Sequence, residues 1–175
     1  MRIIQKKTLA YYAGTMYNYE NSMEEANFMV RPMTKEDYKE VYDLWIRISG
    51  LGIRSIDDSE AGVHKFLDRN PGLSVVDVEE GKIVGAILSG HDGRRGCFYH
   101  VCVDEAWRNR GIARNMVNVA LAALKEEGIN KINIIAFRNN RLGNGFWTKL
   151  GWTMRQDVNY YEFNLNENNV TEFVK

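Results

Sequence analysis

A chain of 175 residues is long enough for one domain with a single hydrophobic core, but short for two. Apolar residues make up 45% and charged residues 26% of the chain, ordinary globular proportions that exclude disorder throughout. The formal net charge of +0 argues against a nucleic-acid-binding protein that depends on a broad basic surface.

Cysteine usage and the lack of long apolar runs indicate a soluble cytoplasmic protein. The two cysteines, Cys97 and Cys102, lie five residues apart in one strand-like run, CFYHVCV. Because strand side chains alternate between faces, this odd separation places the thiols on opposite faces and disfavours a disulfide between them. Reduced thiols suit the cytosol, and no run of about eighteen apolar residues predicts a membrane span. The N-terminus is a poor signal peptide.

Regular structure is predicted after the first 27 residues. Residues 1–27 show no clean period and form an N-terminal extension that could pack on the domain or on the second copy in a homodimer. A short strand, FMVR, follows, and Thr34 with Asp37 forms a capping-box pattern at the start of a helix. Apolar side chains recur at helical spacing up to Ile48. A second helix is predicted to begin at the acidic stretch of residues 57–59 and to end at Arg69.

The rest of the chain predicts an α/β fold (α+β type) with one mixed sheet flanked by helices. Turn residues separate three strands into an antiparallel meander, and a long amphipathic helix leads by a crossover to a buried strand parallel to the third. The predicted elements are strands at 73–79, 82–90 and 97–103, a helix at 112–127, a strand at 129–137, a helix at 142–150, strands at 152–156 and 159–165, and a loose polar tail at 166–175. The element order is β-α-α-β-β-β-α-β-α-β-β.

The stretch WRNRGIARNM, residues 107–116, places three arginines and a glycine where the long helix begins. The N-terminus of a helix carries partial positive charge, so arginines are unfavourable there unless an anion offsets them. Small residues let a ligand approach the backbone, and the first helical turn leaves its N–H donors unpaired. The pattern Arg108-x-x-Gly111-x-Ala113 is neither a P-loop nor a dinucleotide-binding glycine motif. It predicts a phosphate-type anion site of another kind.

This pattern between a strand and a long helix resembles the pyrophosphate loop of the GNAT superfamily, the acetyl-CoA-dependent N-acetyltransferases. The segment NRLGNGFWTKLGW is similar to the late-helix motif N-x-x-A-x-x-F-Y-x-x-x-G-F of that superfamily. With the element order, the resemblance covers residues 28–165, and the bacterial RimI/YpeA-type branch looks most similar. It implies the GNAT acyltransferase fold and acetyl-CoA as co-substrate. A primary amine, of a small molecule or a protein N-terminus, would attack acetyl-CoA directly in a ternary complex.

The resemblance also implies where acetyl-CoA binds. Backbone groups of Val101 and Val103 would pair with the pantetheine arm as an added strand does, and the N–H of Cys102 or Val103 would polarise the thioester carbonyl. Asn140 would hydrogen-bond the cofactor, and Phe146 would pack against it. The pyrophosphate would be held by loop N–H groups and arginine side chains, from Arg108, Asn109, Arg110, Gly111, Ile112 and Ala113.

The residues for proton transfer follow the superfamily pattern less closely. A tyrosine of the late-helix motif assists thiolate departure in the superfamily, but Trp147 stands there and cannot give up a proton at physiological pH. Either the thiolate leaves without a dedicated acid, or Tyr160 or Tyr161 on the last predicted strand substitutes. As candidate bases, Tyr99 and His100 lie on opposite faces of their strand, so at most one faces the acceptor. A water relay is the alternative to both.

The acceptor side leaves alternatives open. The link GLGIRSIDDSE, residues 50–60, could attract a cationic amine through Asp57 and Asp58, or these carboxylates could simply stabilise the helix that follows. The substitution at Trp147 also admits a non-catalytic acyl-CoA-binding sensor or scaffold of the same fold.

Two other kinds of site are disfavoured. A nucleotide-binding regulator would need a P-loop lysine or a ribose-binding acid, and neither motif is present. A metal site is disfavoured because the thiols of Cys97 and Cys102 are predicted to face opposite ways and because the spacing of the possible ligands is unlike that of zinc sites. The four residues considered as metal ligands are His91, Cys97, His100 and Cys102.

Overall fold

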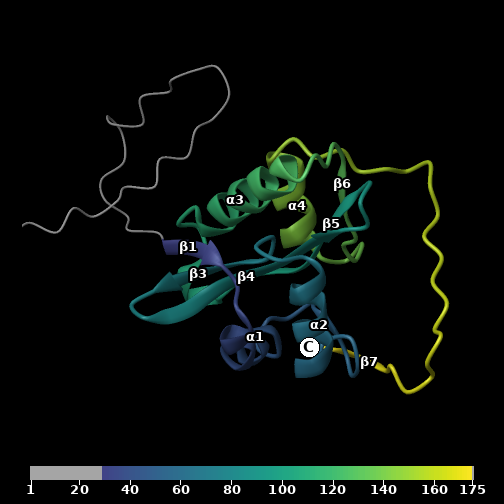
Figure 1. The fold of residues 1–175 in the computed structure, drawn as a ribbon. Coiled ribbons are helices and arrows are strands. Elements are labelled where there is room, and N and C mark those ends of the chain that lie inside the picture. Colours follow the sequence, from purple (N-terminus) through teal and green to yellow (C-terminus); the bar gives the residue numbers. More distant parts are fainter. Residues whose placement is uncertain (1–28, 175) are drawn as a thin grey trace, which may run out of the picture.

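A five-stranded sheet organises residues 29–174, the part of the chain that the computed structural model describes (Figure 1). Neighbouring strands are antiparallel except for the last two, β5 and β6, which are parallel. The predicted α/β class, the meander and the parallel crossover are therefore confirmed. The predicted extension of residues 1–27 and its dimer contact lie outside the described residues. In spatial order the strands are β1 (Met29–Pro32), β3 (Val75–Glu79), β4 (Lys82–His91), β5 (Gly96–Val103) and β6 (Ile132–Ile134).

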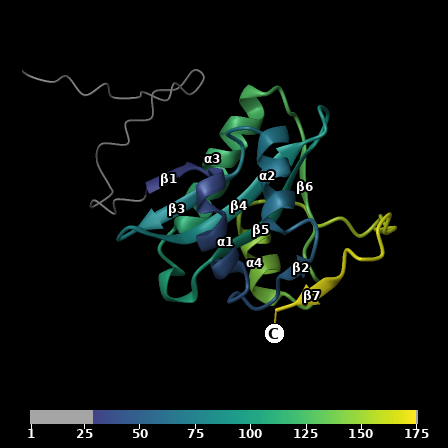
Figure 2. The same ribbon diagram turned by 60° about the horizontal axis from the view of Figure 1, so that its bottom comes forward.

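Helices cover both faces of this sheet and bury an apolar core on each (Figure 1 and Figure 2). Because strand side chains alternate, β4 directs Ala86 and Leu88 into the α1–α2 core and Ile87 into the α3–α4 core. None of the helices within residues 29–174 is long and apolar enough to cross a membrane. The helices are η2 (Lys35–Asp37), α1 (Tyr38–Trp45), α2 (Glu60–Arg69), η3 (Glu105–Trp107), α3 (Ile112–Glu126) and α4 (Arg141–Lys149).

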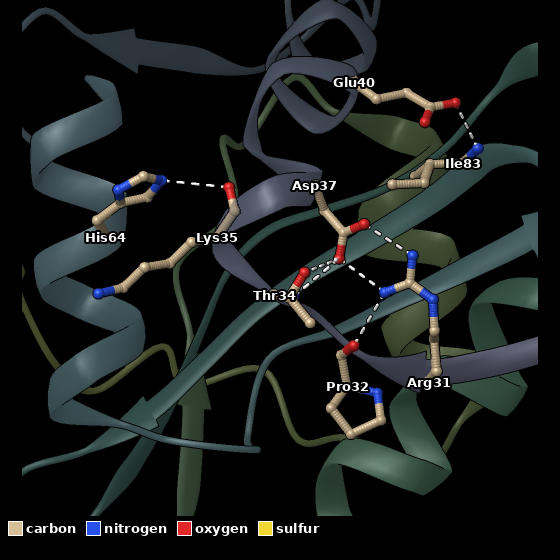
Figure 3. A network of polar contacts seen from close by, with 8 residues as sticks. All are labelled: Arg31, Pro32, Thr34, Lys35, Asp37, Glu40, His64 and Ile83. Atoms are coloured by element: carbon tan, nitrogen blue, oxygen red, sulfur yellow. Dashed lines mark hydrogen bonds and ion pairs between the residues drawn. The ribbon is translucent and has the colours of Figure 1, made fainter.

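A polar network fixes the start of the first helical segment against the sheet (Figure 3). The Arg31 guanidinium donates two hydrogen bonds of 2.7 Å to Asp37, which also accepts the Thr34 backbone N–H at 2.8 Å. Burial alone would raise the pKa of Asp37, but the hydrogen bonds from Arg31 and Thr34 bring it below its ordinary value. Glu40 accepts the backbone N–H of Ile83 at 2.7 Å, which ties α1 to β4.

The C-terminal region differs from the prediction. Residues 152–165 form no strand, and their apolar side chains beyond Trp152 are exposed, from 58% for Val158 to 95% for Leu165, while Trp152 packs on the α3–α4 core. A strand forms instead in the segment predicted as a loose tail: β7 (Thr171–Phe173) pairs antiparallel with β2 (Gly52–Arg54), inside the predicted link between the first two helices. The alternating pattern of residues 152–165 suits a strand, but a strand also needs a partner edge.

That edge is missing because β6 is shorter than predicted. The predicted strand spans residues 129–137, whereas β6 comprises only Ile132–Ile134. Beyond it, Ile135 is 55% exposed and Phe137 is 43% exposed, so this part of the predicted buried strand is not buried. Phe137 packs instead against Phe173 of β7, with 5.4 Å between ring centroids.

Candidate functional site

One edge of β5 has no strand beside it over its C-terminal half. β4 pairs with β5 as far as Val103, whereas β6 pairs only with residues 96–98. The Asp104 N–H donates to the Val84 carbonyl at 2.8 Å, so by alternation Val103 and Val101 direct their backbone groups away from β4. Among the described strands none pairs with those groups. An extended ligand could therefore bind there as an added strand.

Cys102 lies differently from its two neighbours. It is the register partner of Ala86 in β4, and its side chain is only 5% exposed, within the α1–α2 core. By the same alternation its backbone groups face β4. Between the two residues predicted to polarise a bound carbonyl, the geometry therefore favours Val103 over Cys102.

A β-bulge at His100 overturns the predicted face assignment of β5. The register between β4 and β5 shifts at this point, and His100 adopts the left-handed conformation with φ 48°. Tyr99 contacts Phe66 of α2 with 5.8 Å between ring centroids, and His100 contacts Trp45 of α1 at 4.6 Å. Both side chains face α1 and α2, so the prediction that they lie on opposite faces is wrong. The bulge adds one residue to β5 and thereby breaks the alternation.

The same bulge places both cysteines on one face of β5, so the prediction that their thiols lie on opposite faces is wrong. Cys97 lies two residues before Tyr99 and its thiol interacts with the Tyr99 hydroxyl, while Cys102 is buried in the α1–α2 core. Both thiols therefore face the same side, although both cysteines are free. Burial raises the pKa of Cys97, and it raises the pKa of Cys102 to about 12. Neither thiol is an effective nucleophile at neutral pH.

The residues considered as metal ligands are engaged elsewhere. His91 Nδ1 accepts the Gly93 N–H at 3.0 Å within the β4–β5 turn, and His100 pairs with a carboxylate described below. Within residues 29–174 no group of three or more histidine, cysteine, aspartate or glutamate side chains is placed to hold a metal ion.

The loop between β5 and α3 exposes unpaired backbone donors. Gly111 precedes α3 in the left-handed conformation, with φ 89°, and offers no side chain to cap the helix. The first intrahelical bond runs from the Asn115 N–H to the Gly111 carbonyl, so the N–H groups of residues 112–114 have no acceptor within the helix. A Cβ at Gly111 would meet nothing within 4 Å. The space in front of these donors is open.

Two arginines hold their charge beside these donors. Arg108 Nε donates to the Val103 carbonyl at 3.3 Å, and its Nη1 lies 2.9 Å from Glu105. Arg110 lies over the Trp107 ring, 4.5 Å from the centroid. Both side chains fold back on their own loop, and the first turn of α3 contains no acidic residue. The loop thus offers unpaired backbone donors, the Arg110 guanidinium and an Arg108 guanidinium paired with Glu105 directly beyond the free edge of β5, and an anion would fit the donors.

The late-helix residues have packing and capping roles. The Asn140 side chain accepts the Gly143 N–H at 2.8 Å and so caps α4. Phe146 lies 5.0 Å from Trp147, and Trp147 lies 4.6 Å from Trp152, between ring centroids. Trp147 is only 8% exposed in the α3–α4 core. The indole therefore fills the core at the position where the superfamily motif has a tyrosine.

A buried carboxylate–imidazole pair lies on the other face of β5. His100 Nε2 is 2.6 Å from Asp58 Oδ1, and the two side chains are 13% and 7% exposed. Asp58 Oδ2 accepts the Arg54 N–H at 2.7 Å, and the Tyr38 hydroxyl donates to the Asp58 carbonyl at 3.0 Å. The predicted alternatives for Asp58 were attraction of the substrate and stabilisation of α2, but Ser59 is the residue that caps α2. Sequence reasoning missed this pair because 42 residues separate its members.

A surface pocket of about 270 Å³ lies where the β2–α2 link meets the C-terminal coil. Arg54 at its wall pairs with Glu162 at 3.0 Å, and Asp57 accepts a hydrogen bond of 2.8 Å from Asn169. This is the region predicted to receive the acceptor. The lining residues are Arg54, Ile56, Asp57, Phe163, Asn164, Leu165, Asn166 and Asn169.

The two candidate tyrosines have different surroundings. Burial raises the pKa of Tyr99 above its ordinary value, and the neighbouring Cys97 raises it further. Tyr99 therefore keeps its proton at neutral pH. Tyr160 is 63% exposed in the C-terminal coil, with its hydroxyl 3.4 Å from Glu162.

Comparison with known proteins shows the family to which the chain belongs. The model of the Acetyltransferase (GNAT) family matches residues 36–152. An acetyltransferase of Sodalis glossinidius (strain morsitans) is 32% identical over 129 residues, which cover 74% of this chain and 89% of that protein.

Solved structures share the fold at low sequence identity. The aminoglycoside N-acetyltransferase AAC(6')-Iy in complex with coenzyme A aligns with a TM-score of 0.65 and 14% identity, covering 80% of this chain and 97% of that one. A ribosomal-protein-alanine N-acetyltransferase from Brucella melitensis biovar Abortus 2308 aligns with a TM-score of 0.59 and 18% identity, covering 78% and 99%. By its family match and its relative, the chain belongs to the GNAT family of acetyltransferases.

Proposed function

We propose that this GNAT-family protein moves the acetyl group of acetyl-CoA to a primary amine, which attacks directly in a ternary complex. One observation carries the proposal: the free edge of β5 leads straight into the unpaired donors at the start of α3. A ligand with an extended part and an anionic part fits this arrangement: the extended part would lie along the edge of β5, and the anionic part would lie at the unpaired donors. Coenzyme A has both parts, and the AAC(6')-Iy structure contains it.

In the proposed complex the chain binds acetyl-CoA mainly through its backbone. The N–H groups of Val101 and Val103 pair with the pantetheine arm, and that of Val103 is best placed to polarise the thioester carbonyl. The N–H groups of residues 109–113 hold the diphosphate, and Arg108 and Arg110 add positive charge. The Asn140 side-chain oxygen caps α4, so its NH2 group would donate the hydrogen bond to the cofactor. Phe146 would pack on the cofactor.

The acceptor amine is proposed to approach from the α1–α2 face of β5. Among the candidate bases, we favour His100, because the raised pKa of Tyr99 disfavours its deprotonation. Tyr160 would serve only as a surface contact to the acceptor. Because Trp147 is packed in the core, coenzyme A leaves as a thiolate without a dedicated acid. Solved structures of this fold include an aminoglycoside N-acetyltransferase and a ribosomal-protein-alanine N-acetyltransferase, and we propose both a small-molecule amine and a protein N-terminus as acceptors to be tested.

The test is a transfer assay on the purified chain. Acetyl-CoA is incubated with aminoglycosides, small polyamines and peptides with different N-terminal residues, and acetylated products are measured by mass spectrometry. We expect protein-dependent acetylation within one of these classes. Saturable binding of acetyl-CoA without any acetylated product would contradict catalysis and favour the alternative, an acyl-CoA-binding sensor or scaffold.

A further inference from the structure

The buried pair of His100 and Asp58 indicates how the proposed reaction handles its proton. We propose that Asp58 is a positioning residue: it holds the hydrogen of His100 on Nε2 and leaves Nδ1 free to take the proton of the acceptor amine. This inference rests on the proposed acetyl transfer and adds to it a specific atom and a second residue.

The pair is held from three elements at once. The β-bulge of β5 presents His100 with φ 48°, an unusual conformation for a residue other than glycine. Trp45 of α1 packs against the imidazole at 4.6 Å between ring centroids. The Tyr38 hydroxyl and the Arg54 N–H fix Asp58 through its carbonyl and its Oδ2. A strained residue that faces a buried, fully oriented carboxylate is typical of functional sites.

Hydrogen-bonding chemistry decides which imidazole nitrogen carries the hydrogen. An ionised carboxylate only accepts hydrogen bonds, so the 2.6 Å contact between Asp58 Oδ1 and His100 Nε2 requires a hydrogen on Nε2. In the neutral ring Nδ1 is then the acceptor. Nδ1 makes no hydrogen bond to any residue in the described part of the chain. Nδ1 is also not among the fully buried, unpartnered side-chain atoms of residues 29–174, so it keeps contact with solvent, from which an acceptor amine would approach.

The proposed step moves one acetyl group and one proton. The lone pair of the amine forms the new C–N bond to the acetyl carbon, and Nδ1 of His100 takes the proton that the amine nitrogen loses. The electron pair of the C–S bond leaves with the sulfur of coenzyme A. Asp58 stabilises the imidazolium that forms, because its charge lies 2.6 Å from the ring. The imidazolium later returns the proton to the thiolate or to water.

The substitution Asp58→Asn tests this role with little change of shape. The Arg54 N–H needs an acceptor at the Oδ2 position, so the amide oxygen of asparagine takes that place and its NH2 group faces His100. The NH2 group donates to Nε2, and the ring hydrogen must move to Nδ1. The variant therefore inverts the tautomer and blocks the atom proposed to accept the proton. Asp68→Asn on the exposed surface of α2 is the control with the same change of charge.

Two readouts separate positioning from a merely structural role. Nitrogen NMR of the His100 ring should show hydrogen on Nε2 in the wild type and on Nδ1 in Asp58→Asn. With the acceptor found in the transfer assay, kcat should fall about 10²- to 10⁴-fold, the usual range for loss of general-base catalysis, while the acceptor KM stays within about twofold. Acetyl-CoA should still raise the unfolding midpoint of the variant. Asp68→Asn should behave as the wild type.

Other results would overturn the proposal. An inverted tautomer with unchanged kcat would remove Nδ1 as the proton acceptor, and a wild-type ring with hydrogen on Nδ1 would remove the role of Asp58. If Asp58→Asn does not fold, His100→Gln is measured instead and should lose kcat to the same extent. A wild type that acetylates no amine would sink the proposed function itself, which is a different result from an active enzyme that tolerates Asp58→Asn.

Discussion

Asp77 in β3 is a buried carboxylate without a partner. Its side chain is 0% exposed, and neither of its oxygens accepts a hydrogen bond from a described residue. Burial, together with the nearby charge of Glu79, raises its pKa from 3.8 to about 6. The folded protein therefore binds this proton more tightly than the unfolded chain does. The stabilisation from the protonated form is complete below about pH 4 and is lost as the pH rises through 6.

We predict that Asp77→Asn stabilises the protein above pH 7. A pKa raised by about two units corresponds to roughly 2–3 kcal/mol, of which the unpaired amide of asparagine would cancel a part. A net gain of about 2 kcal/mol raises the unfolding midpoint by roughly 4–8 °C in a chain of this size. The gain should vanish at pH 4. Asp43→Asn, which removes a charge from an exposed pair with Lys39, is the control and should shift the midpoint little at either pH. Equal midpoints for wild type and Asp77→Asn at pH 8 would contradict the argument.

At single residues, a local pattern marked the loop before α3, whereas no local pattern marked the pair of His100 and Asp58. Gly111 and the arginines beside it stood out because a loop that opens a helix has a local signature, and their role in binding an anion stays a prediction. The pairing of His100 with Asp58 has no such signature, because it depends on a bulge and on a contact across 42 residues. The bulge also reversed the expected faces, since an alternating sequence does not show where an extra residue enters a strand.

Among the elements, β7 holds the β2–α2 link, which carries the proposed acceptor side of the site. The Gly50 N–H donates to the Val174 carbonyl at 3.1 Å, and the Ser55 N–H donates to the Val170 carbonyl at 2.9 Å. These bonds flank β2, and the Arg54 N–H at its end binds Asp58. β7 therefore lies outside the cofactor loop but supports the residues that orient His100.

We predict that a chain ending at residue 169 loses acceptor function before cofactor binding. Without residues 170–174, the backbone amides of Gly50 and Ser55 lose their acceptors and should exchange hydrogen at least about tenfold faster. The acceptor KM should rise and kcat should fall, while acetyl-CoA still stabilises the protein. Hydrogen exchange by mass spectrometry measures the first effect, and a chain lacking only Lys175 is the control. Unchanged exchange at residues 50–55 would show that β7 does not hold the link.

The helices were predictable from the sequence, and the strands near the C-terminus were not. Helix α3 could be predicted from its own residues, because its apolar side chains recur at helical spacing and Gly128 follows its last turn. Residues 152–165 have the alternation of strands but pair with no strand, and the pairing of β2 with β7 joins short segments more than a hundred residues apart. Strand identity depends on the partner, which a local pattern cannot supply.

At the scale of the molecule, β5 lies between the two halves of the proposed reaction. Its free edge and the loop after it form the proposed acetyl-CoA site, while its bulge turns His100 toward α1, α2 and the β2–α2 link. The proposed domain of residues 28–165 contains both halves, and the family match at 36–152 falls within it. The branch within the superfamily and the dimer contact of residues 1–27 stay predictions.

The central claim is that acetyl-CoA binds where β5 leads into α3, and calorimetric titration tests it most directly. Gly111 and Gly128 are matched sites at the two ends of α3: both have a left-handed φ, 89° and 77°, and at both an added Cβ meets nothing within 4 Å. Glutamate at either position carries the same backbone strain and the same charge, but only Gly111→Glu puts its carboxylate before the unpaired donors. We predict one-to-one binding of acetyl-CoA to the wild type and to Gly128→Glu, and binding weaker by at least about 100-fold, roughly 3 kcal/mol, in Gly111→Glu. Equal binding by all three proteins, or none by the wild type, would contradict the account.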